Sequence, residues 1–177
     1  MYIWVGIDVD SQLSEIGKLS LKAREEIGCA PPDFTLPLHV SLKISFEVPD
    51  REVERVVRDI ENIYRESGAF IMKVRGIEYC EVITWVAIER NPGLDALHDR
   101  LNTFLKDKYG VPLHEYDTDY KYHSTLYMDD DRERVRKVYE KIKDEPIPRE
   151  LRAERFLVGM SKSGVPGTYE VVSHTVK

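Results

Sequence analysis

The chain has 177 residues, of which 42% are hydrophobic, and its formal net charge is −6. This length and composition fit one soluble domain, or two small lobes packed together, with a real hydrophobic core. The basic residues are dispersed, which excludes the basic stripe that grips a long duplex. A nucleic-acid substrate would therefore be held at a terminus or as a small nucleotide. No apolar run reaches the ~18–20 residues that span a bilayer.

The first ten residues lack the basic and cleavage features of a secretory signal, so a cytoplasmic location is expected. The only cysteines are Cys29 and Cys80, and neither has metal-ligand spacing. We therefore expect a reduced, monomeric protein that has no structural disulfide, no cofactor and no obligate protein partner.

Hydrophobic periodicity predicts a strand–helix–strand–helix–strand series that occurs twice, followed by one further strand. The first series is predicted as strand 2–9, helix 11–27, strand 37–46, helix 51–66 and strand 69–79. The second is predicted as strand 83–90, helix 92–108, strand 121–128, helix 131–143 and strand 150–160, before a last strand at about 168–175. The expected caps are Asp50 and Gly68 for helix 51–66, Asn91 and Gly110 for helix 92–108, and Asp129 or Asp130 for helix 131–143.

A pattern of histidine, any residue, a hydroxyl residue and leucine occurs once in each half of the chain. It reads His39-Val40-Ser41-Leu42 and His123-Ser124-Thr125-Leu126. Side chains alternate between the two faces of a strand, so each histidine shares a face with its hydroxyl residue. Two imidazoles and two hydroxyls brought together would make an acid–base pair around a small anion. A phosphate ester is the obvious candidate.

The duplication extends beyond this motif, because Trp4 and Trp85 stand in similar strands that open the two series. Two such units predict an α+β fold, in which two antiparallel sheets related by a pseudo-twofold line a central cleft and helices cover the outer faces. A single domain with lobes at approximately 1–80 and 81–177 is expected. The two tryptophans could stack a nucleobase, but packing near the pseudo-symmetric interface is favoured.

These residues resemble the two-histidine phosphoesterase superfamily, particularly its 2′-5′ RNA ligase branch, also described as RNA 2′,3′-cyclic phosphodiesterases. That family repeats His, an apolar residue, Ser or Thr, and an apolar residue in a bilobal α+β fold. The first motif matches fully, whereas Ser124 stands where the family has an apolar residue, which concerns packing more than chemistry. The resemblance implies His39 as proton donor, His123 as proton acceptor, and Ser41 and Thr125 as phosphate-binding residues.

The chemistry of imidazole supports this assignment independently, since its ordinary pKa of about 6.5 lets one ring be charged while its partner is neutral. Lys43, Lys121 and Tyr127 share the polar faces of the two motif strands and are candidate substrate contacts. Asp117, Asp119 and the run 129–131 are interpreted as helix caps and solvated loop, so no metal site is expected. Surface or structural roles are favoured for the remaining histidines, which are His98, His114 and His174.

The sequence thus predicts a metal-independent phosphoesterase that hydrolyses 2′,3′-cyclic phosphates, or cleaves or forms 2′-5′ linkages, in RNA ends or small nucleotides. The alternative is a non-catalytic RNA- or nucleotide-binding module on the same fold, against which the intact histidine and hydroxyl pairs argue. Ligation reverses the same transesterification and would use the same residues. The substrate, the direction of the reaction and the order of donor and acceptor are left open by the sequence alone.

Overall fold

The computed structural model describes residues 1–29, 36–118 and 120–177, so the interpretation of Asp119 lies outside the described residues. The strands form two four-stranded antiparallel sheets. The first has the order β2 (His39–Glu47), β1 (Tyr2–Asp8), β7 (Arg155–Ser161) and β8 (Glu170–Val176). The second has the order β5 (His123–Met128), β4 (Ile83–Ile88), β3 (Phe70–Cys80) and β6 (Glu150–Ala153).

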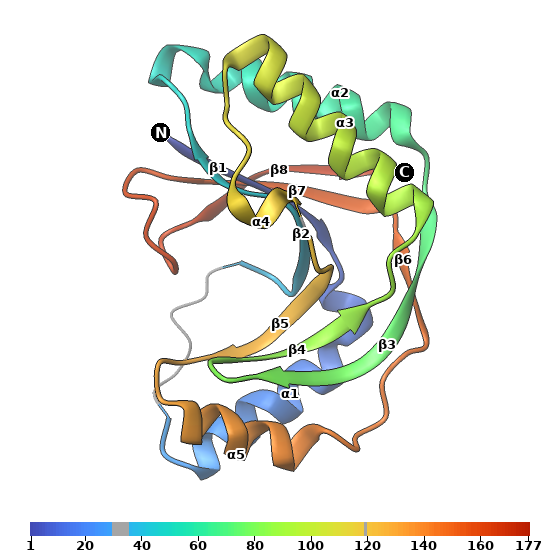
Figure 1. Ribbon diagram of the computed structural model, residues 1–177, viewed down its shortest axis with the longest axis vertical. Coiled ribbons are helices and arrows are strands. Elements are labelled where there is room, and N and C mark those ends of the chain that lie inside the picture. The colour runs from blue at the N-terminus through green and yellow to red at the C-terminus, as the bar shows by residue number, and fades with distance from the viewer. Residues whose placement is uncertain (30–35, 119) are drawn as a thin grey trace.

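Two helices cover the outer face of each sheet (Figure 1). Helices α2 (Val53–Ser67) and α3 (Pro92–Tyr109) contact each other and the first sheet, while α1 (Asp10–Glu26) and α5 (Arg132–Ile142) contact each other and the second. This confirms the predicted α+β fold with helices on the outer faces. A 3-10 turn (Asp50–Glu52) before α2 and a short helix α4 (Glu115–Thr118) complete the described elements.

Each sheet takes strands from both halves of the sequence. β3 pairs with β4 of the second half, and β7 pairs with β1 of the first. The predicted strand 150–160 is therefore two strands, because Ala153 is the last partner of β3 and Arg155 begins the pairing with β8. The chain crosses from one sheet to the other at Glu154. The lobe boundary near residue 80 stays a prediction about the sequence repeat, since the sheets do not divide there.

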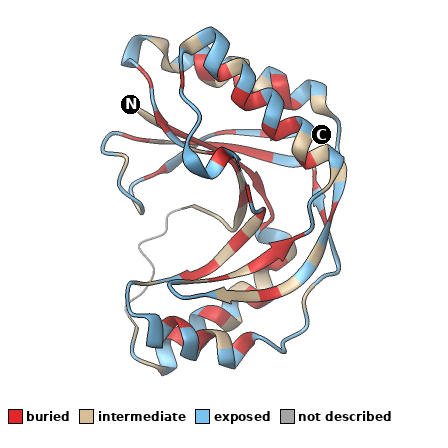
Figure 2. Cartoon of the chain, in the orientation of Figure 1, coloured by how far each residue is buried: buried red, intermediate tan, exposed pale blue. Residues whose placement is uncertain are grey.

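The apolar stripes lie where their spacing predicts. Figure 2 shows buried residues along the helix faces turned toward the sheets, and Val56, Ile60 and Ile63 form that face in α2. Burying one such side chain stabilises the fold by about 1.5–3 kcal/mol. No helix in the described ranges is long and apolar enough to cross a membrane.

Most of the predicted caps are confirmed, and two are corrected. The Asn91 side chain accepts the Leu94 amide of α3, and Gly110 ends that helix in the left-handed conformation, as expected. Asp50 opens the 3-10 turn and does not cap α2. Asp131 caps α5 by accepting the amides of Glu133 and Arg134, because the Asp129 carboxylate is already engaged one turn earlier, with Tyr127 and the amide of Asp131.

Candidate active site

The two motif strands meet where the sheets adjoin. β2 is an edge strand of the first sheet, β5 is an edge strand of the second, and the two strands contact each other. Besides burial, the charge of His123 lowers the pKa of His39, so the two imidazoles interact electrostatically. A pocket of 380 Å³ is lined by His39 from the first motif and by Thr125 from the second. Residues from the two halves of the chain are thereby brought to one site.

The two histidines are held by the same device. His39 Nδ1 lies 2.7 Å from the carbonyl oxygen of Pro37, and His123 Nδ1 lies 2.6 Å from the carbonyl oxygen of Lys121. A carbonyl oxygen only accepts hydrogen bonds, so each Nδ1 carries the proton and donates. Each neutral ring therefore keeps its lone pair on Nε2. Nε2 is the atom that can take a proton from a substrate, or return it.

Burial sets the protonation of both rings. It lowers the pKa of His39 to about 4, in the same direction as the charge of His123, while the hydrogen bond to Pro37 and the carboxylate of Asp8 oppose it. Burial also lowers the pKa of His123, against the hydrogen bond to Lys121. Both imidazoles are consequently neutral near pH 7 in the free protein. A bound phosphate would raise both pKa values, because its negative charge favours imidazolium.

Ser41 is fixed by aromatic neighbours. The Trp4 Nε1–H donates to Ser41 Oγ at 3.0 Å, and the hydroxyl of Tyr120 also interacts with Ser41. The Trp4 ring stands edge-on to His39, with centroids 4.3 Å apart. Gly6 makes room for this ring, because a Cβ at that position would lie 2.4 Å from the indole. Trp4 is buried as expected, and its neighbours are residues of the first motif.

Helix α1 forms the other wall of the pocket that His39 and Thr125 line. The chain before β2 approaches this helix closely, since a Cβ on Gly17 would come within 2.9 Å of Leu38. Lys18 and Arg24 line the same pocket and bring two positive charges to it. Sequence reasoning missed both cations. Their spacing gave no signal, because residues six apart lie about 120° from each other around a helix.

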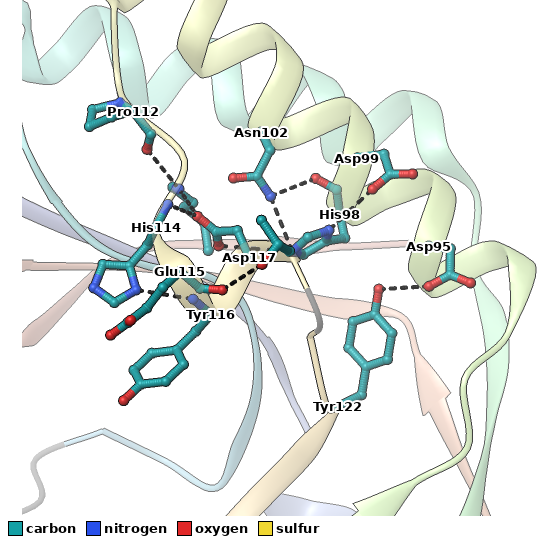
Figure 3. Close-up of polar contacts among 12 residues, drawn as sticks. Asp95, His98, Asp99, Asn102, Pro112, His114, Glu115, Tyr116, Asp117 and Tyr122 are labelled. Atoms are coloured by element: carbon teal, nitrogen blue, oxygen red, sulfur yellow. Dashed lines mark hydrogen bonds and ion pairs between the residues drawn. The ribbon is translucent and has the colours of Figure 1, made fainter.

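Lys43 was expected on the polar face of β2 as a substrate contact, but the pairing of β2 with β1 shifts register on both sides of Lys43, and Lys43 is not a substrate contact. Its side chain is 2% exposed and forms an ion pair with Asp117, whose side chain is fully buried. Lys43 Nζ also donates to the Pro112 carbonyl at 3.3 Å, and Asp117 accepts the amide of His114 at 2.7 Å. Figure 3 shows this cluster beneath α3, with His98 beside Asp117. Asp117 is thus neither a cap nor a solvated loop residue, and it ties the segment before β5 to β2.

The structure also corrects Tyr127. The pairing of β5 with β4 shifts register between Thr125 and Tyr127, and such a bulge takes Tyr127 off the face of His123. Tyr127 is 2% exposed, and its hydroxyl donates to Asp129 at 2.5 Å. The guanidinium of Arg24 lies 4.6 Å from the Tyr127 ring centroid. Tyr127 therefore packs in the core and supports the α1 wall from behind.

Lys121 and Thr125 keep positions compatible with their predicted roles. Thr125 is half-buried and lines the pocket of His39. Lys121 is exposed just before β5, its carbonyl holds His123, and it lines a second pocket together with Trp85. Among the described residues no group of three or more His, Cys, Asp or Glu could hold a metal ion. Independence from metal stays a prediction.

Comparison with known proteins identifies the family and the fold. The family model of the 2′-5′ RNA ligase superfamily matches residues 14–159. TT0787 of Thermus thermophilus is 18% identical with a TM-score of 0.65, covering 99% of this chain and 97% of its own. A structure described as a phosphoesterase is 15% identical with a TM-score of 0.62, covering 98% and 96%. LigT of Escherichia coli, complexed with 3′-AMP, is 17% identical with a TM-score of 0.58, covering 98% and 96%. No curated protein matches the chain by sequence.

Fold and paired motifs define the class of two-histidine phosphoesterases, a class of phosphoesterase- and RNA-ligase-type enzymes. The chain belongs to the 2′-5′ RNA ligase superfamily. The solved structures share too little sequence identity to show more than the fold.

Proposed function

We propose that the protein is a metal-independent phosphoesterase that hydrolyses 2′,3′-cyclic phosphates, or cleaves or forms 2′-5′ linkages, at RNA ends or in small nucleotides. The observation that carries the proposal is the matched pair of histidines on two contacting edge strands. Each histidine donates Nδ1–H to the carbonyl two residues before it and keeps Nε2 for the substrate. A site that only bound nucleotides would need no such pair.

For a cyclic phosphate, His123 would accept a proton from water as the water oxygen forms a bond to phosphorus. The bond from phosphorus to one ribose oxygen breaks, and His39 would donate its proton to that oxygen. The ring opens to a phosphomonoester, and the two imidazoles have exchanged protonation states. Proton transfer by a positioned group typically contributes about 10²–10⁴-fold to the rate.

The lowered pKa of His39 determines when this proton arrives. In the free protein the ring is neutral near pH 7, because burial lowers its pKa to about 4. The charge of the bound phosphate raises that pKa, so His39 takes up its proton with the substrate or after it. The assignment of His39 as donor and His123 as acceptor is part of the proposal.

Hydroxyls and cations would stabilise the negative charge of the transition state. Ser41 and Thr125 would donate hydrogen bonds to the non-bridging phosphate oxygens. Lys18 and Arg24 line the same pocket as His39 and would favour an anion there. A pocket of 380 Å³ lies at the lower end of the usual size of small-molecule sites, about 300–1,000 Å³. LigT was solved in complex with 3′-AMP, and we propose that this chain also binds a nucleotide. We further expect the protein to be a cytoplasmic monomer.

A panel assay with the wild-type protein tests the proposal. The panel holds cyclic mononucleotides, RNA with a 2′,3′-cyclic end and 2′-5′-linked oligonucleotides, and binding of each is measured beside turnover. Hydrolysis of at least one class is expected. Tight binding of the RNA without turnover of any panel member would refute the enzyme and favour a binding module on the same fold.

A further inference from the structure

The two halves use their equivalent tryptophans differently. Trp4 on β1 is 6% exposed, and its Nε1–H donates a hydrogen bond to Ser41 Oγ. Trp85 on β4 is half-buried and lies beside His123, with ring centroids 5.5 Å apart and planes tilted by 49°. No hydrogen bond of the Trp85 indole occurs within the described part of the chain. The duplication therefore makes one tryptophan a wall of the site and leaves the other facing open space.

That space is a second pocket of 350 Å³. We call it the Trp85 pocket, and its other lining residues are Arg75, Glu78, Ala87, Ile88, Arg90, Tyr120, Lys121 and Tyr122. Three cations and one carboxylate line it, in a chain whose net charge is −6. Positive charge is therefore concentrated beside the second motif. A volume of this size accommodates a small ligand of about one nucleotide.

Two residues connect the Trp85 pocket with residues of the candidate active site. Tyr120 lines the pocket and interacts with the hydroxyl of Ser41. Lys121 lines the pocket with its side chain, while its backbone carbonyl holds the imidazole of His123. The Trp85 pocket thus adjoins the second motif on the side of Lys121 and Trp85.

The cations of the pocket are not equivalent. Arg75 is held by Glu78 through two hydrogen bonds, of 2.6 and 2.9 Å, and Arg90 is held by Asp95 at 2.9 Å. Lys121 is exposed and forms no ion pair with any described residue. Lys121 is thus the cation best placed to contact a phosphodiester between the active site and Trp85.

We propose that the Trp85 pocket binds the nucleotide next to the one that carries the reacting phosphate. Its base stacks on Trp85, and the phosphodiester that joins the two nucleotides contacts Lys121. An oligonucleotide end is then preferred as substrate over a free cyclic mononucleotide. This inference rests on the proposed function, which it narrows to one substrate class. An aromatic ring stacks on any base, so the pocket selects for chain length and not for sequence.

Kinetics with two matched substrates test the proposal. The substrates are a mononucleoside 2′,3′-cyclic phosphate and a dinucleotide ending in the same cyclic phosphate. Trp85→Ala should raise KM for the dinucleotide by about 5- to 150-fold, the usual range for losing one stacked base. KM for the mononucleotide should change by less than about 2-fold, because the reacting nucleotide does not reach Trp85. Any change in kcat that comes from losing the ring beside His123 should be the same for both substrates. Trp85→Phe should retain most of the dinucleotide affinity, since phenylalanine also stacks.

Two further variants separate stacking from structural effects. Lys121→Ala keeps the backbone carbonyl that holds His123, and it should weaken the salt dependence of dinucleotide binding by about one phosphate contact. Tyr116→Ala removes an aromatic ring that is 64% exposed on α4, outside both pockets, and should leave both substrates unaffected. If Trp85→Ala raises KM equally for both substrates, or raises it for neither, the proposed subsite is wrong.

Direct binding keeps this inference distinct from the proposed function. Titration calorimetry with a dinucleotide that ends in a 3′-phosphate needs no turnover. The wild type should bind it more tightly than a mononucleoside 3′-phosphate, and Trp85→Ala should remove that difference. If the difference is present but no panel substrate is turned over, the subsite stands and the proposed function fails. If turnover occurs and the two ligands bind equally, the subsite fails alone.

Discussion

Asp117→Asn should destabilise the protein strongly, because it leaves the charge of Lys43 buried without a counter-ion. The side chains of Lys43 and Asp117 are 2% and 0% exposed, so water cannot replace the lost partner. Breaking a buried ion pair from one side costs about 3–5 kcal/mol. For a chain of 177 residues each kcal/mol lowers Tm by about 2–4 °C, which predicts a fall of about 6–20 °C.

Paired variants identify the cause of this loss. Lys43→Met should lower the stability by a similar amount, since it leaves the carboxylate of Asp117 buried without a counter-ion. The double variant Lys43→Met/Asp117→Leu removes both charges and should recover most of the loss, because an apolar pair of similar volume replaces a buried ion pair at little net cost. Glu15→Gln is the surface control, since its partner Lys18 is 70% exposed and such pairs contribute about 0–1 kcal/mol.

Thermal and urea unfolding, followed by circular dichroism at pH 7, measure these differences. A Tm for Asp117→Asn within about 2 °C of the wild type would refute the account of a buried clamp. A double variant as unstable as the sum of the single variants would refute the electrostatic cause, because independent sites add and a coupled pair does not.

Four further predictions follow from the site. The plot of kcat/KM against pH should be bell-shaped with its optimum between about pH 4 and 6.5, because burial lowers the pKa of both His39 and His123. An optimum above pH 7.5 would contradict this prediction. The same lowered pKa values should make unfolding easier as pH falls from 6.5 toward 4, since the unfolded chain takes up protons that the folded chain resists. Turnover should persist in the presence of EDTA. If EDTA abolishes turnover and a divalent cation restores it, the reaction depends on a metal ion. Ser124→Ala should leave activity unchanged and Tm unchanged or higher, because the Ser124 hydroxyl is buried without a partner among the described residues. A fall in Tm of more than about 4 °C would show that the hydroxyl makes a stabilising contact.

Local patterns were sufficient to predict most of the elements and the face that His39 shares with Ser41. Alternation put His39 and Ser41 on one face of β2, and helical spacing gave the buried stripe of α2. Asn91 and Gly110 marked the ends of α3 because capping depends on a few adjacent residues. These features arise within one turn or a few residues, so the sequence carries them directly.

The remaining features depend on contacts between distant residues or on breaks in regular geometry. No residue near Lys43 in the sequence indicates that its charge will be paired with Asp117, which lies 74 residues later. The bulge that buries Tyr127 breaks an alternation that looks regular in the sequence. The crossing at Glu154 cannot be recognised in the sequence, because buried residues continue from β6 into β7 without a turn signal. The openness of Trp85 compared with Trp4 likewise depends on which neighbours the fold brings to each.

Turnover by His39→Ala and His123→Ala on RNA with a 2′,3′-cyclic end tests the central claim most directly, with binding measured in parallel. Each variant should lose about 10²–10⁴-fold in kcat, while Ser41→Ala and Thr125→Ala should each lose about 10–150-fold, equivalent to one hydrogen bond to a charged group. Binding should persist in all four, and Tm should change little because none of the four side chains is fully buried in the hydrophobic core. Wild-type kcat in either histidine variant would contradict the two-histidine mechanism.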